Sequence, residues 1–119
     1  MFLGLRTVIH PAPDLAAAKA WFTAALGIEP YFDEPFYVGY AVAGYELGLD
    51  PDADPSGGTV VHWGVEDADA AYAALLATGA QPHQAVTEVG GGIRVASVVE
   101  PAGASILGII ENPHFELPA

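Results

Sequence analysis

The chain has 119 residues, of which 52% are hydrophobic and 15% charged, and its formal net charge is −12. This length suits one domain with a real core, and the apolar content excludes a disordered chain. The acidic balance argues against nucleic acid or a membrane surface as a partner, and no apolar run approaches the roughly 20 residues of a membrane span. Without cysteine or an apolar leader after Met1, we expect a cytoplasmic protein that has no thiolate metal site.

The first half of the chain predicts a strand, a helix and three further strands. Residues 2–10 alternate like a strand, and the prolines at 11 and 13 end it. Asp14 is suited to cap a helix that ends at Gly27. Strand-like pieces follow near 29–33, 36–42 and 45–49, and the Asp-, Pro- and Gly-rich stretch 50–58 is typical of a linker.

The second half predicts the same order of elements. A strand at 59–65 precedes a helix from about 67 to 78, then strands near 81–88, 93–99 and 104–111 and a tail over 112–119. Thr7-Val8-Ile9-His10 also returns as Thr59-Val60-Val61-His62, 52 positions later (residue 7 to residue 59). A repeated βαβββ module predicts a duplicated α+β fold, with module one over about 2–49 and module two over about 59–111.

This order of elements, with the residues at its helix ends and turns, resembles the glyoxalase/bleomycin resistance protein/dioxygenase group, the vicinal oxygen chelate (VOC) superfamily. The resemblance rests on Asp14-Leu15, Trp21-Phe22, Leu26-Gly27, Val65-Glu66-Asp67, Gly79-Ala80 and Glu100-Pro101-Ala102-Gly103. It implies a single domain over 1–119, in which two βαβββ modules form a curved mixed sheet with a concave cavity. It also implies a homodimer and a small-molecule ligand, although a fold does not fix a reaction.

The resemblance also bears on metal binding. In the superfamily's metalloenzymes, a His or Gln on the first strand and a Glu on the last strand of each module hold the metal. Carried over by position, these four places fall on Thr7, Glu46, Val60 and Leu107. A catalytic zinc or iron takes about three protein ligands, so one carboxylate is not enough. The resemblance therefore implies a protein without the standard metal site and without a cofactor.

A second set of candidate ligands could still bind a divalent metal. His10, His62 and Glu46 would supply the two histidines and one carboxylate of non-haem iron sites. Side chains alternate faces along a strand, so His62, two residues after Val60, is expected to face the cavity. His10 is three residues after Thr7, and the family register places it on the opposite face.

The repeat disagrees with that register, because it makes His10 equivalent to His62. One inserted residue in the turn over 11–13 would reconcile the two, and we favour the repeat.

Three further residues are predicted to bind the ligand. Arg6, if it faced away from the cavity, would lie under a helix without a charge partner, so we place it in the cavity. Tyr37 and Tyr40 fall on opposite faces of one strand, so at most one lines the cavity, and we assign Tyr40. Arg94 is the one cation in the strands of module two and would hold a carboxylate or phosphate.

Three functions stay open. The first is a metal-free small-molecule-binding protein similar to bleomycin resistance proteins, with aromatic walls and a few polar anchors. The second is a lyase, isomerase or dioxygenase-type enzyme that uses Glu46 with His62 and His10, with or without a divalent metal. Without a metal, Glu46 would be the base and His62 the acid. The third is an accessory module without chemistry. The missing metal ligands favour the first.

Overall fold

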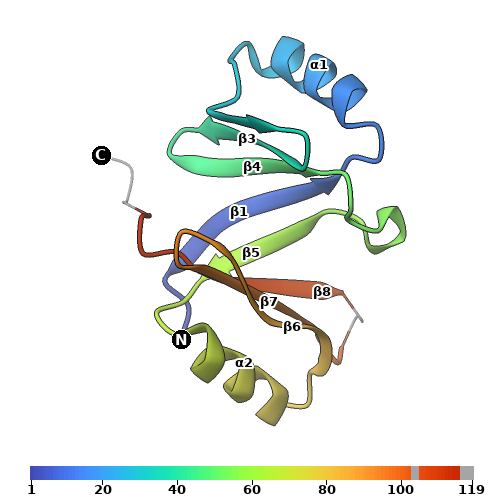
Figure 1. Ribbon diagram of the computed structural model, residues 1–119. Coiled ribbons are helices and arrows are strands. Elements are labelled where there is room, and N and C mark those ends of the chain that lie inside the picture. The colour runs from blue at the N-terminus through green and yellow to red at the C-terminus, as the bar shows by residue number, and fades with distance from the viewer. Residues whose placement is uncertain (103–104, 116–119) are drawn as a thin grey trace. The chain divides into compact units, whose positions relative to one another are not determined.

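The computed structural model describes residues 1–102 and 105–115, and Figure 1 shows its elements. Among the described residues, the chain divides into two compact units, which we call the first unit (residues 7–60) and the second unit (residues 1–6 and 61–115). No helix in the described part of the chain is long and apolar enough to cross a membrane. Each unit contains one α-helix and a mixed β-sheet, which confirms the predicted α+β class and the repeated βαβββ order.

The first unit holds most of β1 (Gly4–Pro11), α1 (Leu15–Leu26), β2 (Phe32–Glu34), β3 (Tyr37–Val42) and β4 (Tyr45–Asp50). A short 3₁₀ turn (Pro55–Gly57) follows in the predicted linker. The strand order is β2-β3-β4-β1, in which β1 pairs with β4 in parallel and the other pairs are antiparallel.

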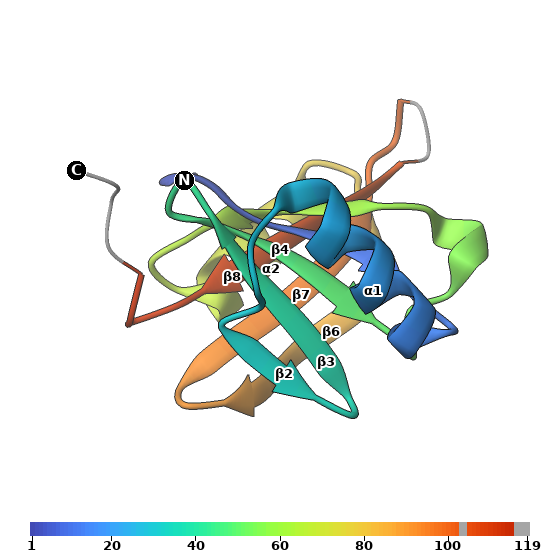
Figure 2. The same ribbon diagram turned by 90° about the horizontal axis from the view of Figure 1, so that it is seen from above.

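The caps of α1 set where the helix begins and ends, and its apolar face packs on the sheet. The Asp14 carboxylate accepts a hydrogen bond from the Ala17 N–H, and Gly27 ends the helix in the left-handed conformation at φ 71°. Figure 2, seen from above, shows α1 crossing β3 and β4. The core between them contains Ala12, Val38, Tyr40 and Leu49, against which Leu15, Ala18, Phe22, Leu26 and Leu47 pack.

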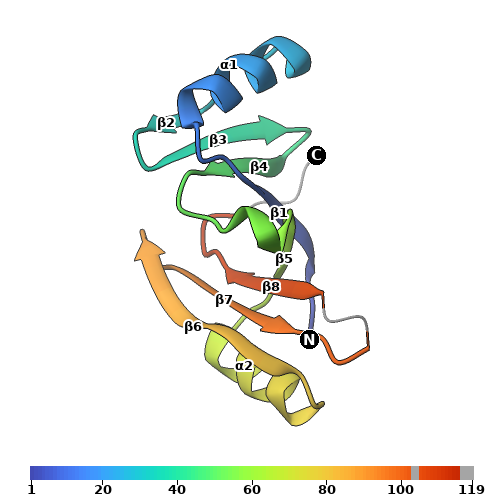
Figure 3. The ribbon, with the colours of Figure 1, turned by 90° about the vertical axis from the view of Figure 1, so that its right-hand side faces the viewer.

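The second unit repeats this plan with β5 (Val60–Gly64), α2 (Ala68–Ala77), β6 (Gln81–Gly90), β7 (Ile93–Val99) and β8 (Ile106–Glu111). The strand order is β5-β8-β7-β6, with β5 and β8 parallel. Figure 3 shows α2 lying beside β6, and the core beneath the helix holds Val65, Ala68, Ala71, Ala96 and Ile109. The predicted strand over 104–111 begins at Ile106, while residues 103–104 and 116–119 lie outside the described residues.

We call the four strands of each unit a half-sheet. Each half-sheet has a helix face, which packs on the helix of its unit, and an opposite face, which we call the far face. In the first unit, Val38, Tyr40 and Leu49 belong to the helix face, since they form the core with α1. Alternation along β3 and β4 puts Gly39 and Glu46 on the far face of the first unit.

Candidate functional site

The carboxylate of Glu46 is the centre of a polar cluster on the far face of the first unit. Thr7 lies opposite it in the parallel β1–β4 pair, and its hydroxyl donates to Glu46 Oε1 at 3.4 Å. The Tyr37 hydroxyl donates to the same oxygen at 3.0 Å, and the Tyr31 hydroxyl donates to Oε2. Three hydroxyl groups from β1, β3 and the segment before β2 thus converge on one side chain.

Two strand glycines make room for this cluster. A Cβ atom on Gly39 would lie 3.0 Å from Glu46 Oε2 and 3.2 Å from the Tyr31 ring. A Cβ atom on Gly48 would lie 2.6 Å from Tyr37 Cζ. A glycine inside a strand often marks a close approach of this kind. Because Gly39 and Gly48 are paired between β3 and β4, they form a floor without side chains under the two tyrosines.

Both phenols of the cluster are held in the protonated, donating form. Burial raises the pKa of the Tyr37 hydroxyl, and the neighbouring Glu46 charge and hydrogen bond raise it further. Burial of the hydroxyl end and the hydrogen bond to Glu46 also raise the pKa of Tyr31, although its residue is 63% exposed. The cluster therefore consists of the Glu46 carboxyl group, which accepts hydrogen bonds from neutral hydroxyl donors.

The structure corrects the choice between the two tyrosines of β3. Tyr40 is fully buried on the helix face, where its hydroxyl lies 2.8 Å from Thr23 Oγ1 and donates to the Lys19 carbonyl at 3.1 Å. It ties the sheet to α1 and is not available to a ligand. Tyr37 occupies the far face instead, as strand alternation requires for a residue three positions away.

The prediction that His10 faces the cavity was also wrong. His10 pairs in register with the core residue Leu49, and its ring lies 5.3 Å from the Phe22 ring of α1. Its Nδ1 is 3.0 Å from the Thr59 hydroxyl. His10 therefore belongs to the helix face of the first unit, opposite the face that carries Glu46.

The reason is a difference of one residue between the sequence repeat and the structural repeat. Asp14 and Asp67 cap the two helices in the same way, and they are 53 positions apart (residue 14 to residue 67). Ala12 and Val65 show the same separation, since each donates its N–H to the last parallel strand of its module, to Asp50 and Ile110. The repeated Thr-Val-x-His run is displaced by 52, and a slip of one residue exchanges the faces of a strand.

In the second unit, His62 lies on the far face. It pairs with Gly108 of β8, and its ring fills the space of a Cβ atom there, with Cδ2 at 2.7 Å. His62 is only 6% exposed. Leu107, by contrast, packs against the core under α2, so alternation places Ile106 and not Leu107 on the face of His62. The fourth metal position is corrected accordingly, and it is still apolar.

The donor groups at the four positions do not fit a metal ion. Thr7, Val60 and Ile106 offer no strong ligand, and the Glu46 carboxylate already accepts three hydroxyl hydrogen bonds. The second set of candidate ligands fails because His10 and Glu46 lie on opposite faces of the same half-sheet. In the described residues, no three His, Cys, Asp or Glu side chains lie close enough together to hold an ion.

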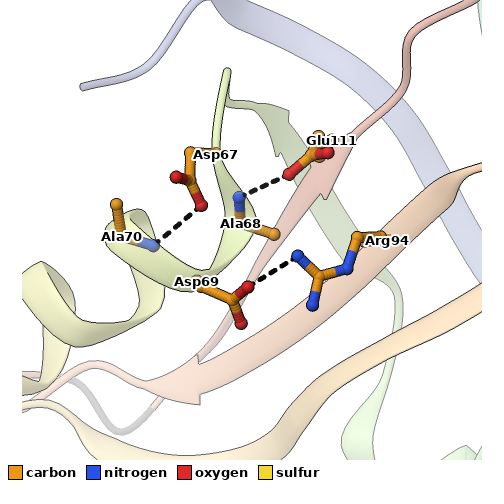
Figure 4. Close-up of polar contacts among 6 residues, drawn as sticks. All are labelled: Asp67, Ala68, Asp69, Ala70, Arg94 and Glu111. Carbon is orange, nitrogen blue, oxygen red and sulfur yellow. Dashed lines mark hydrogen bonds and ion pairs between the residues drawn. The ribbon is translucent and has the colours of Figure 1, made fainter.

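Arg94 faces α2 and not a cavity, which corrects its assignment as a ligand-binding residue. Figure 4 shows its guanidinium donating to Asp69 of α2, with Nη1 and Oδ2 2.6 Å apart. The same view shows Glu111 of β8 accepting from the Ala68 N–H at 2.8 Å, beside the Asp67 cap. These contacts fix the first turn of α2 to the sheet, so we assign Arg94 and Glu111 to the helix attachment.

Arg6 is placed on the far-face side of β5. Its Nε lies 2.6 Å from the position of a Cβ atom on Gly64, and alternation puts Gly64 on the same face as His62. The guanidinium carbon is 3.8 Å from the centre of the Phe115 ring, and Nη1 donates to the Leu5 carbonyl at 3.1 Å.

Sequence reasoning missed Tyr31 and did not select Tyr37. The signal for Tyr37 was available, since it shares a strand face with Gly39 and that face continues at Glu46 on the paired strand. Tyr31 falls in the predicted strand-like piece near 29–33 but precedes β2 in the structure, so its approach to Glu46 depends on the loop conformation.

Comparison with known proteins identifies the fold. No protein-family model matches the chain, and no curated protein matches it. Among solved structures, Streptomyces coelicolor methylmalonyl-CoA epimerase in complex with 2-nitronate-propionyl-CoA is similar with a TM-score of 0.76 and 17% identity, over 99% of this chain and 100% of that one.

A glyoxalase/bleomycin resistance protein/dioxygenase superfamily member from Vibrio splendidus is similar with a TM-score of 0.64 and 18% identity, over 90% and 97% of the two chains. Methylmalonyl-CoA epimerase from Mycobacterium tuberculosis is similar with a TM-score of 0.62 and 20% identity, over 92% and 88%. The chain therefore has the glyoxalase/bleomycin-resistance fold, as the sequence predicted.

Proposed function

We propose that this protein binds a small organic molecule on the far face of the first unit, with Glu46 as the polar anchor and without the standard metal site. The observation that carries the proposal is the convergence of the Tyr31, Tyr37 and Thr7 hydroxyls on one carboxylate over a glycine floor. Ligand sites commonly combine apolar and aromatic walls with a few oriented polar groups.

The aromatic residues around this cluster suit such a site. Tyr31 and Phe36 are 63% and 62% exposed, and Phe32 contacts both Phe36 and Tyr37 edge to face. Exposed aromatic rings gathered beside one carboxylate favour a ligand that has an apolar body. Groups of this kind are enriched where proteins bind partners or ligands.

The charge of the anchor selects the polar end of the ligand. An ionised carboxylate accepts about four hydrogen bonds, and three hydroxyls already donate to Glu46. One acceptor position thus stays for a donor on the ligand, and a cationic donor gains further from the carboxylate and from the faces of the tyrosine rings. We therefore expect an aromatic or apolar amine to bind better than an acid of the same size.

Two probes of similar size and opposite charge test this proposal. Benzylamine and phenylacetate are titrated into isotope-labelled protein, and the NMR signals of Tyr31 and Tyr37 are followed. We expect saturable shifts with benzylamine, which weaken by about tenfold or more in Glu46→Gln. Glu66→Gln is the matched control, because it removes the same charge from an exposed position in the second unit. Equal weakening in both variants, or no saturable shift with benzylamine, would contradict the proposal.

A second candidate is a metal-free epimerase or isomerase in which Glu46 accepts a proton from the substrate. The similar folds of two methylmalonyl-CoA epimerases favour it. If it is correct, incubation with methylmalonyl-CoA in D₂O places deuterium next to the thioester carbonyl, and Glu46→Gln abolishes the exchange. Binding of the probes without exchange supports the first candidate. The contribution of His62 as the acid stays a prediction, which His62→Gln tests in the same assay.

The homodimer implied by the resemblance is a separate prediction. Light scattering after size-exclusion chromatography measures the mass in solution, and a mass of 12.3 kDa would contradict it.

A further inference from the structure

Arg6 differs from the other two cations of the chain. Lys19 pairs with Asp33, and Arg94 pairs with Asp69. In the described part of the chain, no carboxylate pairs with Arg6, although the protein has fifteen acidic residues and only three cations. A guanidinium left without an acid in so acidic a protein calls for an explanation other than fold stability.

The guanidinium of Arg6 is nevertheless held in one orientation. Its Cζ atom lies over the Phe115 ring, 3.8 Å from the ring centre, and the backbone of Gly64 lies close to the side chain, with Cζ 2.9 Å from the place of a Cβ atom. One donor, on Nη1, is used by the Leu5 carbonyl at 3.1 Å. A guanidinium has five N–H donors, and a contact with an aromatic ring uses none of them as a hydrogen bond to an oxygen, so further donors stay able to bond an anion.

The surrounding face supplies further donors and no acid. Gly64 and His62 share the far face of β5, and His62 extends over Gly108. Across β8, Gly108 pairs with Ser97 of β7, whose hydroxyl lies 2.7 Å from His83 Nδ1. His62, Ser97 and His83 thus follow one another across neighbouring strands of the far face.

The acidic residues of these strands project to the other side or lie outside them. Glu111 contacts the start of α2, and Glu88 pairs with Arg94, which belongs to the same helix face. Glu100 lies in the turn after β7, where it accepts from Ser105. At the described positions of β5, β7 and β8, no carboxylate occupies the far face.

We propose that the far face of the second unit binds an oxyanion, a carboxylate or phosphate group of a small molecule, through the fork of Arg6, with His62 as a neighbouring donor. Paired N–H groups of a guanidinium match two oxygens of either anion. Gly64 and Phe115 are the positioning residues, since both contact the Arg6 side chain at its guanidinium end. This site is independent of the Glu46 cluster, which selects the opposite charge.

Titration with inorganic phosphate and with propionate, at constant ionic strength with chloride as the reference, tests the site. NMR follows the Arg6 side-chain signal and the His62 ring. We expect a saturable shift with at least one of the two anions that chloride does not produce, and the anion that gives it identifies the oxyanion class. The dissociation constant should rise about tenfold or more in Arg6→Gln.

Arg94→Gln is the matched control, since it removes the same charge from a side chain that faces α2, and it should bind the anions as the native protein does. Arg6→Lys keeps the charge but lacks the fork, so weaker binding in this variant supports bidentate recognition and also decides the question if Arg6→Gln does not fold. Equal loss in Arg94→Gln, unchanged binding in both Arg6 variants, or shifts with chloride alone would overturn the proposal. Because benzylamine binding is measured in the same variants and is expected to be unchanged, failure here is distinct from failure at Glu46.

Discussion

The phenol ring of Tyr37 lies over Gly48, and its Cζ atom is 2.6 Å from the position that a Cβ atom at residue 48 would occupy. No side chain larger than hydrogen fits there unless the ring moves. Because the same ring donates its hydroxyl to Glu46, the glycine on β4 and the position of the anchor are physically coupled.

The first prediction follows from this coupling. Gly48→Ala should displace Tyr37 and lower the free energy of unfolding by about 1–3 kcal/mol, since overpacking a filled space costs this much. Chemical denaturation measures the change. In a Tyr37→Ala background the same substitution should cost much less, because the ring no longer occupies the space. An equal cost in both backgrounds would show that residue 48 and Tyr37 are not coupled.

A second prediction concerns the attachment of α2. Glu111→Ala removes the acceptor of the Ala68 N–H and should lower the free energy of unfolding by about 0.5–2 kcal/mol, as the loss of a helix cap does. Asp69→Asn, which breaks the exposed pair with Arg94, should change stability little, since exposed ion pairs contribute little. Chemical denaturation of both variants compares the two contacts. A larger loss of unfolding free energy in Asp69→Asn than in Glu111→Ala would show that the ion pair, and not the Glu111 hydrogen bond, is the stronger attachment of α2.

The sequence predicted the fold because apolar periodicity, helix caps and turn residues agree along both modules. Asp14, Gly27 and Asp67 mark helix ends where the structure has them, and element boundaries differ by a few residues. The site was harder to predict, since it depends on which face of a strand a residue occupies. The sequence repeat has a displacement of 52 residues and the structural repeat one of 53. Because of this difference of one residue, the repeat predicted the wrong face for His10.

Most contacts between segments far apart in sequence could not be predicted. The choice of Tyr40 over Tyr37 required knowledge of which face α1 covers, and Arg94 required the position of Asp69 on α2. Glu46 was selected through the resemblance and His62 from strand alternation, and each lies on the far face of its own half-sheet. The hydroxyl groups around Glu46 come from three segments, and strand alternation indicates only that of Tyr37 on the paired strand.

The third prediction separates His10 from ligand binding. His10→Ala removes a ring that packs on Phe22 and should lower the free energy of unfolding by roughly 1–3 kcal/mol, as truncations of packed side chains do. Benzylamine binding at Glu46 should be unchanged, because the two side chains lie on opposite faces. His10→Phe keeps a ring and should be more stable than His10→Ala. Weaker benzylamine binding in a fully folded His10→Phe variant would place His10 in the site and contradict the structure.

The fourth prediction is a loss of stability at high pH caused by Tyr37. Burial and the Glu46 carboxylate raise its pKa in the folded chain, whereas in the unfolded chain the phenol ionises near pH 10. Above that pH, unfolding therefore releases a proton. The contribution of Tyr37 to the free energy of unfolding is thus fully present below pH 10 and is lost as the pH rises further. The slope due to this residue is at most about 1.4 kcal/mol per pH unit. Denaturation at several pH values should show a shallower slope in Tyr37→Phe, and an ultraviolet titration of Glu46→Gln should show a phenol that ionises at lower pH than in the native protein. An unchanged slope in Tyr37→Phe would mean that its hydroxyl is not withdrawn from water.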